Sequence, residues 1–158
     1  MKLFIAAILL LPVLAQAANI PDPKIGSSIC YEGVNSAKMI DKRLNKINVK
    51  LTRYKEFPET LYASIAVVTQ KSNKYGNGGA VADNKTAPVV DARMDCDGGG
   101  FKLTPDAKDA SKVSLTIEGL SLISKNAGCG DMYIDNKNPA QSITLKRSAK
   151  CKHVEPNF

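Results

Sequence analysis

The chain has 158 residues, of which 22 are Lys or Arg and 15 are Asp or Glu, so its formal net charge is +7. This length suits a single domain, and a content of 44% hydrophobic residues is enough for a core without a metal or cofactor. One His, no Trp and few, scattered arginines argue against His-based catalysis and against a nucleic-acid recognition motif.

The first seventeen residues have the pattern of a secretory signal peptide. Lys2 gives a short positive region, residues 3–14 are apolar, and Ala15-Gln16-Ala17 is a small-x-small cleavage signal. The apolar run is shorter than the about twenty residues that span a bilayer, and no second run of that length follows. We therefore expect residues 1–17 to be removed from an exported protein without a transmembrane segment. Its expected location is periplasmic or extracellular, with a bacterial envelope favoured.

Four cysteines follow, an even number that favours two disulfides in an oxidising compartment. They are Cys30, Cys96, Cys129 and Cys151. A nested pairing of Cys30 with Cys151 and of Cys96 with Cys129 would clamp both ends of the folded part, but two other pairings are open. No two cysteines have the close spacing of a zinc site, so we expect no metal and no cofactor.

The chain after the signal peptide divides into three predicted parts. Residues 18–29, which contain Pro21 and Pro23, are expected to be a loose leader, residues 30–151 one β domain, and residues 152–158 a flexible tail.

The first regular segment of the β domain is ambiguous. Ala37, Ile40 and Leu44 recur at helical spacing, and Ser36 is available as an N-cap. Residues 36–45 are therefore either a short helix or a strand.

Alternating apolar and polar side chains predict the strands that follow. They cover residues 46–52, 61–69, 89–96, 101–103, 113–117, 120–122, 133–134 and 143–145. Residues 97–100 are expected to turn the chain, and Glu118-Gly119 to turn or bulge it. About seven to eight short strands with turn signals predict an all-β fold, either a single antiparallel β-sandwich or a small barrel.

A polar, glycine-rich stretch over residues 72–85 is expected to be a loop, because Gly, Asn and Asp adopt turn conformations at little cost. Its centre combines a cation and an aromatic ring with flexible neighbours, a composition that suits a protein contact. The candidate binding loop consists of Lys74, Tyr75, Gly76, Asn77, Gly78 and Gly79.

Little in the chain indicates catalysis. His153 lies in the predicted tail, and no Ser occurs in a Gly-x-Ser-x-Gly turn. Asp91, Asp95 and Asp97 share one strand face, an arrangement that could hold calcium or transfer protons. Arg93 on the same face favours an ordinary solvated surface instead. We therefore expect no catalytic residues and no enzyme activity.

The expected function is binding. A basic protein favours an acidic protein or an anionic envelope component as its partner, although dispersed lysines that only keep a secreted protein soluble are the simpler explanation of the charge. The leading hypothesis is an inhibitor or immunity protein that inserts the 74–79 loop into the acidic cleft of an envelope hydrolase or secreted effector. This rests on analogy of fold with inhibitors of lysozyme and other wall hydrolases. The alternative is a binder of lipopolysaccharide or a cell-wall polymer; no oligomeric state is predicted.

Overall fold

The computed structural model describes residues 19–34, 36–83, 89–95, 99–123, 131–135 and 141–152. Within these ranges the chain forms nine strands and one short helix, α1 (Ala37–Ile40). The strands are β1 (Ser27–Val34), β2 (Leu44–Arg53), β3 (Leu61–Thr69), β4 (Asn73–Asp83), β5 (Val89–Met94), β6 (Gly99–Pro105), β7 (Lys112–Leu122), β8 (Met132–Ile134) and β9 (Ser142–Ser148). The predicted signal peptide and His153 lie outside the described residues.

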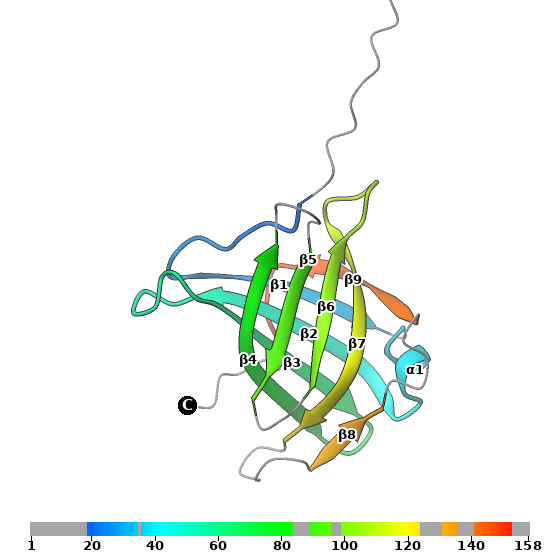
Figure 1. Cartoon of the computed structure of the whole chain (residues 1–158). Helices are drawn as coiled ribbons and strands as arrows, with labels where there is room; N and C mark the ends of the chain where they lie inside the picture. Colours follow the sequence, from blue (N-terminus) through cyan, green and yellow to red (C-terminus); the bar gives the residue numbers. More distant parts are fainter. Residues whose placement is uncertain are drawn as a thin grey trace, which may run out of the picture.

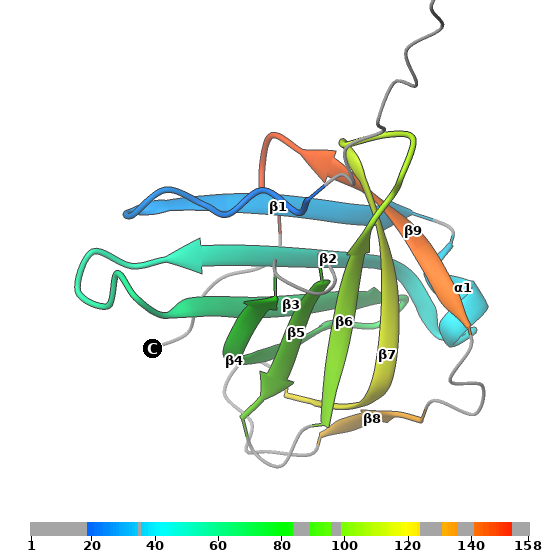
Figure 2. The ribbon, with the colours of Figure 1, turned by 45° about the horizontal axis from the view of Figure 1, so that its top comes forward.

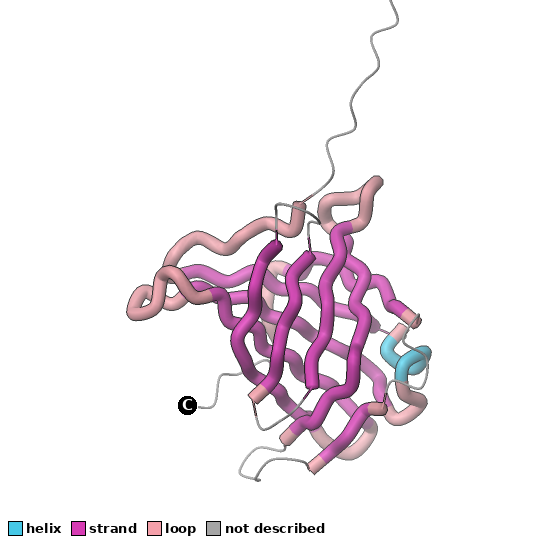
Figure 3. Tube along the Cα trace, viewed as in Figure 1, coloured by secondary structure: helices cyan, strands magenta, loops and turns pink. Residues whose placement is uncertain are grey.

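The strands close into an antiparallel barrel (Figure 1). Strands β1 to β7 pair in chain order, and β9 completes the ring by pairing with both β7 and β1. Strand β8 pairs with the end of β7, beyond the part of β7 that pairs with β9. Figure 2 shows β1, β2 and β3 crossing β5, β6 and β7 steeply, so the barrel consists of two crossed layers. The predicted all-β fold is confirmed, and strands make up most of the described chain (Figure 3).

Period-two alternation places the core inside this ring. On β2, Ile47, Val49 and Leu51 are fully buried, and they pair with the equally buried inward side chains of β3. Phe101 on β6 and Tyr31 on β1 are the largest fully buried side chains. Inward-facing side chains therefore fill the barrel as in other small barrels.

The predicted loop over residues 72–85 is wrong, because residues 73–83 form β4, which pairs with β3 and with β5. The inward positions of β4 are small because its neighbours fill the space. A Cβ on Gly76 would meet Leu122 at 3.0 Å and Ile65 at 3.2 Å, and a Cβ on Gly78 would lie 1.8 Å from the Arg93 carbonyl oxygen. These glycines permit close packing inside a strand and do not mark a turn.

The leader expected over residues 18–29 is wrong at both of its described ends. Ile20 is buried in the core, and β1 begins at Ser27. The Arg53 guanidinium holds the intervening segment by donating two hydrogen bonds to the Asp22 carboxylate, at 2.8 and 2.9 Å. Alternation in the sequence did not predict β1, because the third inward position of this strand is Gly33. A Cβ at that position would lie 2.6 Å from the Leu145 side chain.

Residues 36–45, for which the sequence left a short helix and a strand open, contain a short helix and the start of a strand. Helix α1 occupies only Ala37–Ile40, and β2 starts at Leu44. Ser36 precedes the helix, but its side chain makes no capping hydrogen bond. No helix in the described ranges has the length and apolar character needed to cross a membrane.

The predicted irregularity at Glu118-Gly119 is confirmed as a register shift between β6 and β7. Gly99 and Gly119 face each other there with positive φ angles of 68° and 111°. A Cβ on Gly99 would lie 2.0 Å from the Gly119 carbonyl oxygen. Glycine at both positions therefore lets β7 bend.

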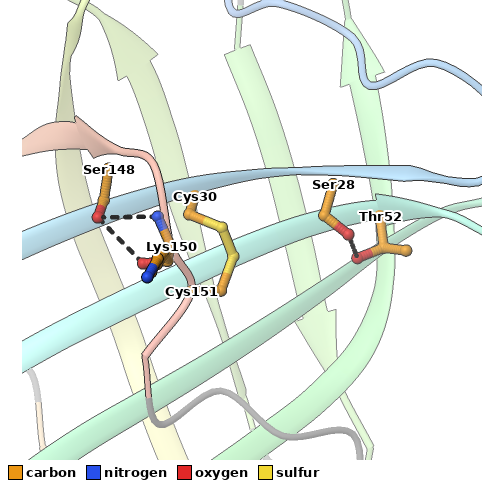
Figure 4. Close-up of a disulfide and its surroundings, with 6 residues drawn as sticks. All are labelled: Ser28, Cys30, Thr52, Ser148, Lys150 and Cys151. Carbon is orange, nitrogen blue, oxygen red and sulfur yellow. Dashed lines mark hydrogen bonds between the residues drawn. A yellow bond between two sulfur atoms is a disulfide. The ribbon is translucent and has the colours of Figure 1, made fainter.

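A disulfide joins Cys30 on β1 to Cys151 after β9 (Figure 4). The two cysteines are 121 residues apart in sequence, and their Cα atoms are 5.3 Å apart. The Ser148 hydroxyl donates to the Lys150 carbonyl oxygen at 3.0 Å, which turns the chain after β9. The Cys30–Cys151 bond belongs to the nested arrangement, which was one of the three pairings that the sequence allowed. Cys96 and Cys129 lie outside the described residues.

Candidate functional site

A pocket of about 560 Å³ opens where the α1–β2 turn, the β3–β4 turn and the start of β8 meet. Figure 1 shows α1 and β8 on the same side of the barrel. The pocket is lined by Lys42, Arg43, Thr69, Gln70, Lys71, Ser72, Lys74, Asp131 and Met132. Four of these side chains are basic and one is acidic, so we call it the cationic pocket.

Thr69 fixes the β3–β4 turn on one side of the cationic pocket. Its hydroxyl accepts hydrogen bonds from the backbone N–H groups of Lys71 (3.2 Å) and Ser72 (3.0 Å) and donates one to the Ser72 carbonyl oxygen (2.8 Å). Such hydroxyl bonds hold a tight turn in one conformation. Lys71 is therefore presented on a fixed backbone with its side chain exposed.

Arg43 ties the α1–β2 turn to β8. Its guanidinium donates to both carboxylate oxygens of Asp41, at 2.6 to 3.0 Å, and to the Tyr133 carbonyl oxygen at 3.0 Å. These bonds from Arg43 hold the pKa of Asp41 below its usual range. The Arg43 charge is thus paired, and the neighbouring Lys42 is left exposed at the pocket rim.

The four bases of the cationic pocket differ in how far they are paired. Lys74 occupies an inward position at the start of β4 and forms an ion pair with Asp131. Lys42 and Lys71 form no ion pair with any residue that the structure describes. Two ammonium groups at the rim therefore remain available to a ligand.

This arrangement suits an anion. The unpaired ammonium groups supply positive charge, and the polar side chains of Gln70 and Ser72 supply hydrogen-bond donors. A concave site lined by one sign of charge concentrates ions of the opposite sign. Phosphate and carboxylate groups are the anions that lysine side chains commonly bind.

The structure separates the residues of the predicted binding loop. Lys74 alone among the six lines the cationic pocket. Tyr75 pairs through its backbone with Ile123, with both N···O distances 2.8 Å. Gly76 and Gly78 face the core, and Gly79 is exposed on the outer face. The side chain of Asn77 lies outside the described residues.

Sequence reasoning missed Lys42, Arg43 and Asp131 as members of a site. The adjacent bases Lys42-Arg43 were a visible signal, but their partners lie in segments far along the chain. The β2–β3 pairing places the turn before β2 beside the turn after β3, and the start of β8 joins them only in the folded barrel.

One of the predicted strand-face carboxylates, Asp91 on β5, belongs to an ion network with Glu118 on β7, whereas Asp95 forms no ion pair within the described part of the chain. Asp91 and Glu118 each pair with both Arg93 and Lys102, and the shortest contacts are Lys102 Nζ to Glu118 Oε1 at 2.6 Å and Arg93 Nη1 to Glu118 Oε2 at 2.9 Å. The expected partial neutralisation by Arg93 is confirmed. Asp97 lies outside the described residues, among which no group of His, Cys, Asp and Glu could hold a metal ion.

The protein is a small antiparallel β-barrel with a cationic pocket and with a disulfide that joins the first strand to the segment after the last strand. The chain matches no protein-family model, and no curated protein or solved structure is significantly similar to it.

Proposed function

We propose that this protein is a non-catalytic binding protein of the bacterial envelope, which holds an anionic envelope component in the cationic pocket. The observation that carries the proposal is the excess of bases in the lining, with Lys42 and Lys71 exposed and unpaired within the described chain. The signal-peptide pattern of residues 1–17 supports export to that location. Lipopolysaccharide and many cell-wall polymers carry the phosphate or carboxylate groups that such a pocket attracts.

The size of the charge effect supports this ligand class. A lysine near an anionic surface contributes about 1 kcal/mol, so two unpaired lysines account for roughly a thirty-fold gain in affinity. The excess of bases over acids along the chain adds a long-range attraction that speeds encounter with a polyanion. Both contributions are screened by salt, because the Debye length is about 8 Å at physiological ionic strength.

The test is binding of the purified protein to lipopolysaccharide and to an anionic cell-wall polymer, each at low and high salt. A neutral polysaccharide serves as the control ligand. We expect saturable binding to at least one anionic ligand that weakens steeply with salt. Equal affinity for the neutral polysaccharide, or affinity that salt leaves unchanged, would contradict the proposal.

Inhibition of an envelope hydrolase is a second candidate function, but the 74–79 segment cannot carry it as an inserted loop. The β2–β3 hairpin projects from one side of the barrel (Figure 2). Phe57 near its tip is 53% exposed, and Arg53 braces the hairpin by donating a hydrogen bond to the Pro58 carbonyl oxygen at 3.1 Å. A preorganised projection with an exposed ring is suited to insertion into a cleft.

This second function has its own test. If the protein inhibits a hydrolase of the exported fraction, Phe57→Ala is expected to abolish inhibition and to leave binding of the anionic ligand unchanged. Inhibition that survives this substitution would argue against the hairpin.

A further inference from the structure

A second, smaller pocket of about 80 Å³ lies beside the base of the β2–β3 hairpin. Its lining includes Tyr54, Tyr62, Ser64, Gly78, Gly79 and Asp95. The cationic pocket lies at the end of β3 that contains Thr69, whereas this pocket lies at the other end, next to Leu61. We call it the tyrosine pocket.

Two aromatic rings form adjoining walls of the tyrosine pocket. The ring centroids of Tyr54 and Tyr62 are 5.2 Å apart, and the ring planes are inclined by 69°. The Phe57 ring packs against Tyr62 with a centroid distance of 6.4 Å, which braces that wall from the hairpin. Burial raises the pKa of Tyr54, so its phenol stays neutral at physiological pH.

Strand register leaves open space beside the rings. Tyr62 on β3 pairs with Gly79 on β4, and Gly79 is exposed with nothing within 4 Å of the position where a Cβ would stand. The side chain of Arg93, which pairs with Gly79 from β5, is held by Asp91 and Glu118. A small group can therefore reach the Tyr62 ring without displacing a side chain at Gly79.

Asp95 gives the tyrosine pocket its charge. It is the one ionised group among the lining residues, and it forms no ion pair with the described part of the chain. Its side chain follows β5 directly and is exposed. The tyrosine pocket is therefore negative, whereas the cationic pocket is positive.

We infer that the tyrosine pocket binds an organic ammonium group, either that of a small amine or that of a lysine side chain on a partner protein. A cation is attracted to aromatic rings and also to an unpaired carboxylate, and the lining of this pocket contains both kinds of residue. An anion would be repelled by Asp95, and the small volume suits a head group of a few atoms. This site is independent of the proposed anion binding.

The test is an NMR titration of the ¹⁵N-labelled protein with three probes. Butylammonium represents a small amine, N-acetyl-lysine methylamide represents a lysine side chain, and N-acetyl-norleucine methylamide is the uncharged analogue. We expect the two ammonium probes to shift the amide signals of Tyr62, Ser64 and Gly79 and the uncharged probe to leave them in place. Tighter binding of the blocked lysine than of butylammonium would assign the site to a partner protein, and equal binding would assign it to a small amine. Equal shifts with the uncharged probe, or no shifts, would overturn the inference.

Matched variants separate the pocket from general charge effects. Asp95→Asn keeps the shape of an exposed side chain, so the fold is retained, and affinity for the ammonium probes is expected to fall on the order of five-fold. Tyr62→Leu is expected to weaken binding by a similar factor by removing a ring face. Glu56→Gln removes an acid of the same hairpin that does not line the pocket and should change nothing. Wild-type affinity in Asp95→Asn would overturn the inference.

Discussion

Gly78 and Gly79 are adjacent on β4 but face opposite sides of the barrel wall. A Cβ on Gly78 would lie 1.8 Å from the backbone oxygen of Arg93, whereas a Cβ on Gly79 would meet nothing within 4 Å. Replacing each glycine with alanine therefore separates the cost of overpacking, which is expected only at Gly78, from the change in backbone flexibility, which both substitutions share.

We expect Gly78→Ala to lower the free energy of unfolding by about 1–3 kcal/mol, because the backbone of β5 must move to admit the methyl group. Gly79→Ala is expected to change it by no more than about 0.5 kcal/mol. Urea denaturation of both variants measures the difference. Equal stabilities of the two variants would contradict the inward position of Gly78.

The ion network on β5, β6 and β7 predicts how stability depends on pH. The hydrogen bond from Lys102 holds the pKa of Glu118 below its usual range, and Arg43 does the same for Asp41. A carboxyl group with a lowered pKa in the folded state stabilises the fold above its unfolded pKa, near 4.3 for Glu. This stabilisation is lost as the pH falls through the folded-state pKa.

The free energy of unfolding is therefore expected to decrease below about pH 4, and to decrease less steeply in Glu118→Gln than in the wild type. Urea denaturation over a series of pH values measures both slopes. Identical slopes in the two proteins would show that Glu118 is not coupled to Lys102.

Among the elements, strands with large alternating side chains could be predicted from the sequence, and strands with inward glycines could not. Strand β3 matches its predicted range of residues 61–69, because Leu61, Ala63, Ile65 and Val67 display the period. Strand β4 carries glycine at two inward positions, so the same period is invisible there, and turn chemistry was inferred instead. Local patterns do not reveal that a neighbouring strand will fill the space above a glycine.

Predicting the candidate site would have required knowledge of contacts between segments that are distant in the sequence. The basic character of the chain predicted an anionic partner, which remains the proposal. The location of the site did not follow, because Lys42, Lys71 and Asp131 come together only through strand order and register. Lys74 was singled out for a loop contact, and it reaches the pocket because β4 begins there.

The disulfide links the first strand of the ring to the segment after the last. In the chain-entropy account, a loop of 121 residues stabilises the fold by about 4–5 kcal/mol. We expect Cys30→Ala/Cys151→Ala to lower the free energy of unfolding by about that amount and to retain the strand signal in circular dichroism. A loss below about 1 kcal/mol would mean that pairing of β1 with β9 alone closes the barrel.

At the scale of the whole molecule, the β2–β3 pair separates two pockets of opposite charge. The cationic pocket lies where β2 begins and β3 ends, and the tyrosine pocket lies where β2 ends and β3 begins. The two pockets share no lining residue, so a small ligand in one leaves the other open. A partner that presents both an anionic and an ammonium group could engage both ends only if it spans the barrel.

We propose the cationic pocket as the site that holds the anionic ligand. The most direct test of this proposal compares the affinity of Lys42→Gln/Lys71→Gln for the anionic envelope ligand with that of the wild type and of Lys108→Gln, which removes an exposed lysine outside the pocket. We predict a loss of roughly thirty-fold, about 2 kcal/mol, in the double variant at low salt and almost none in the control. Equal losses in the two variants, or none in the double variant, would show that the ligand does not bind in the cationic pocket.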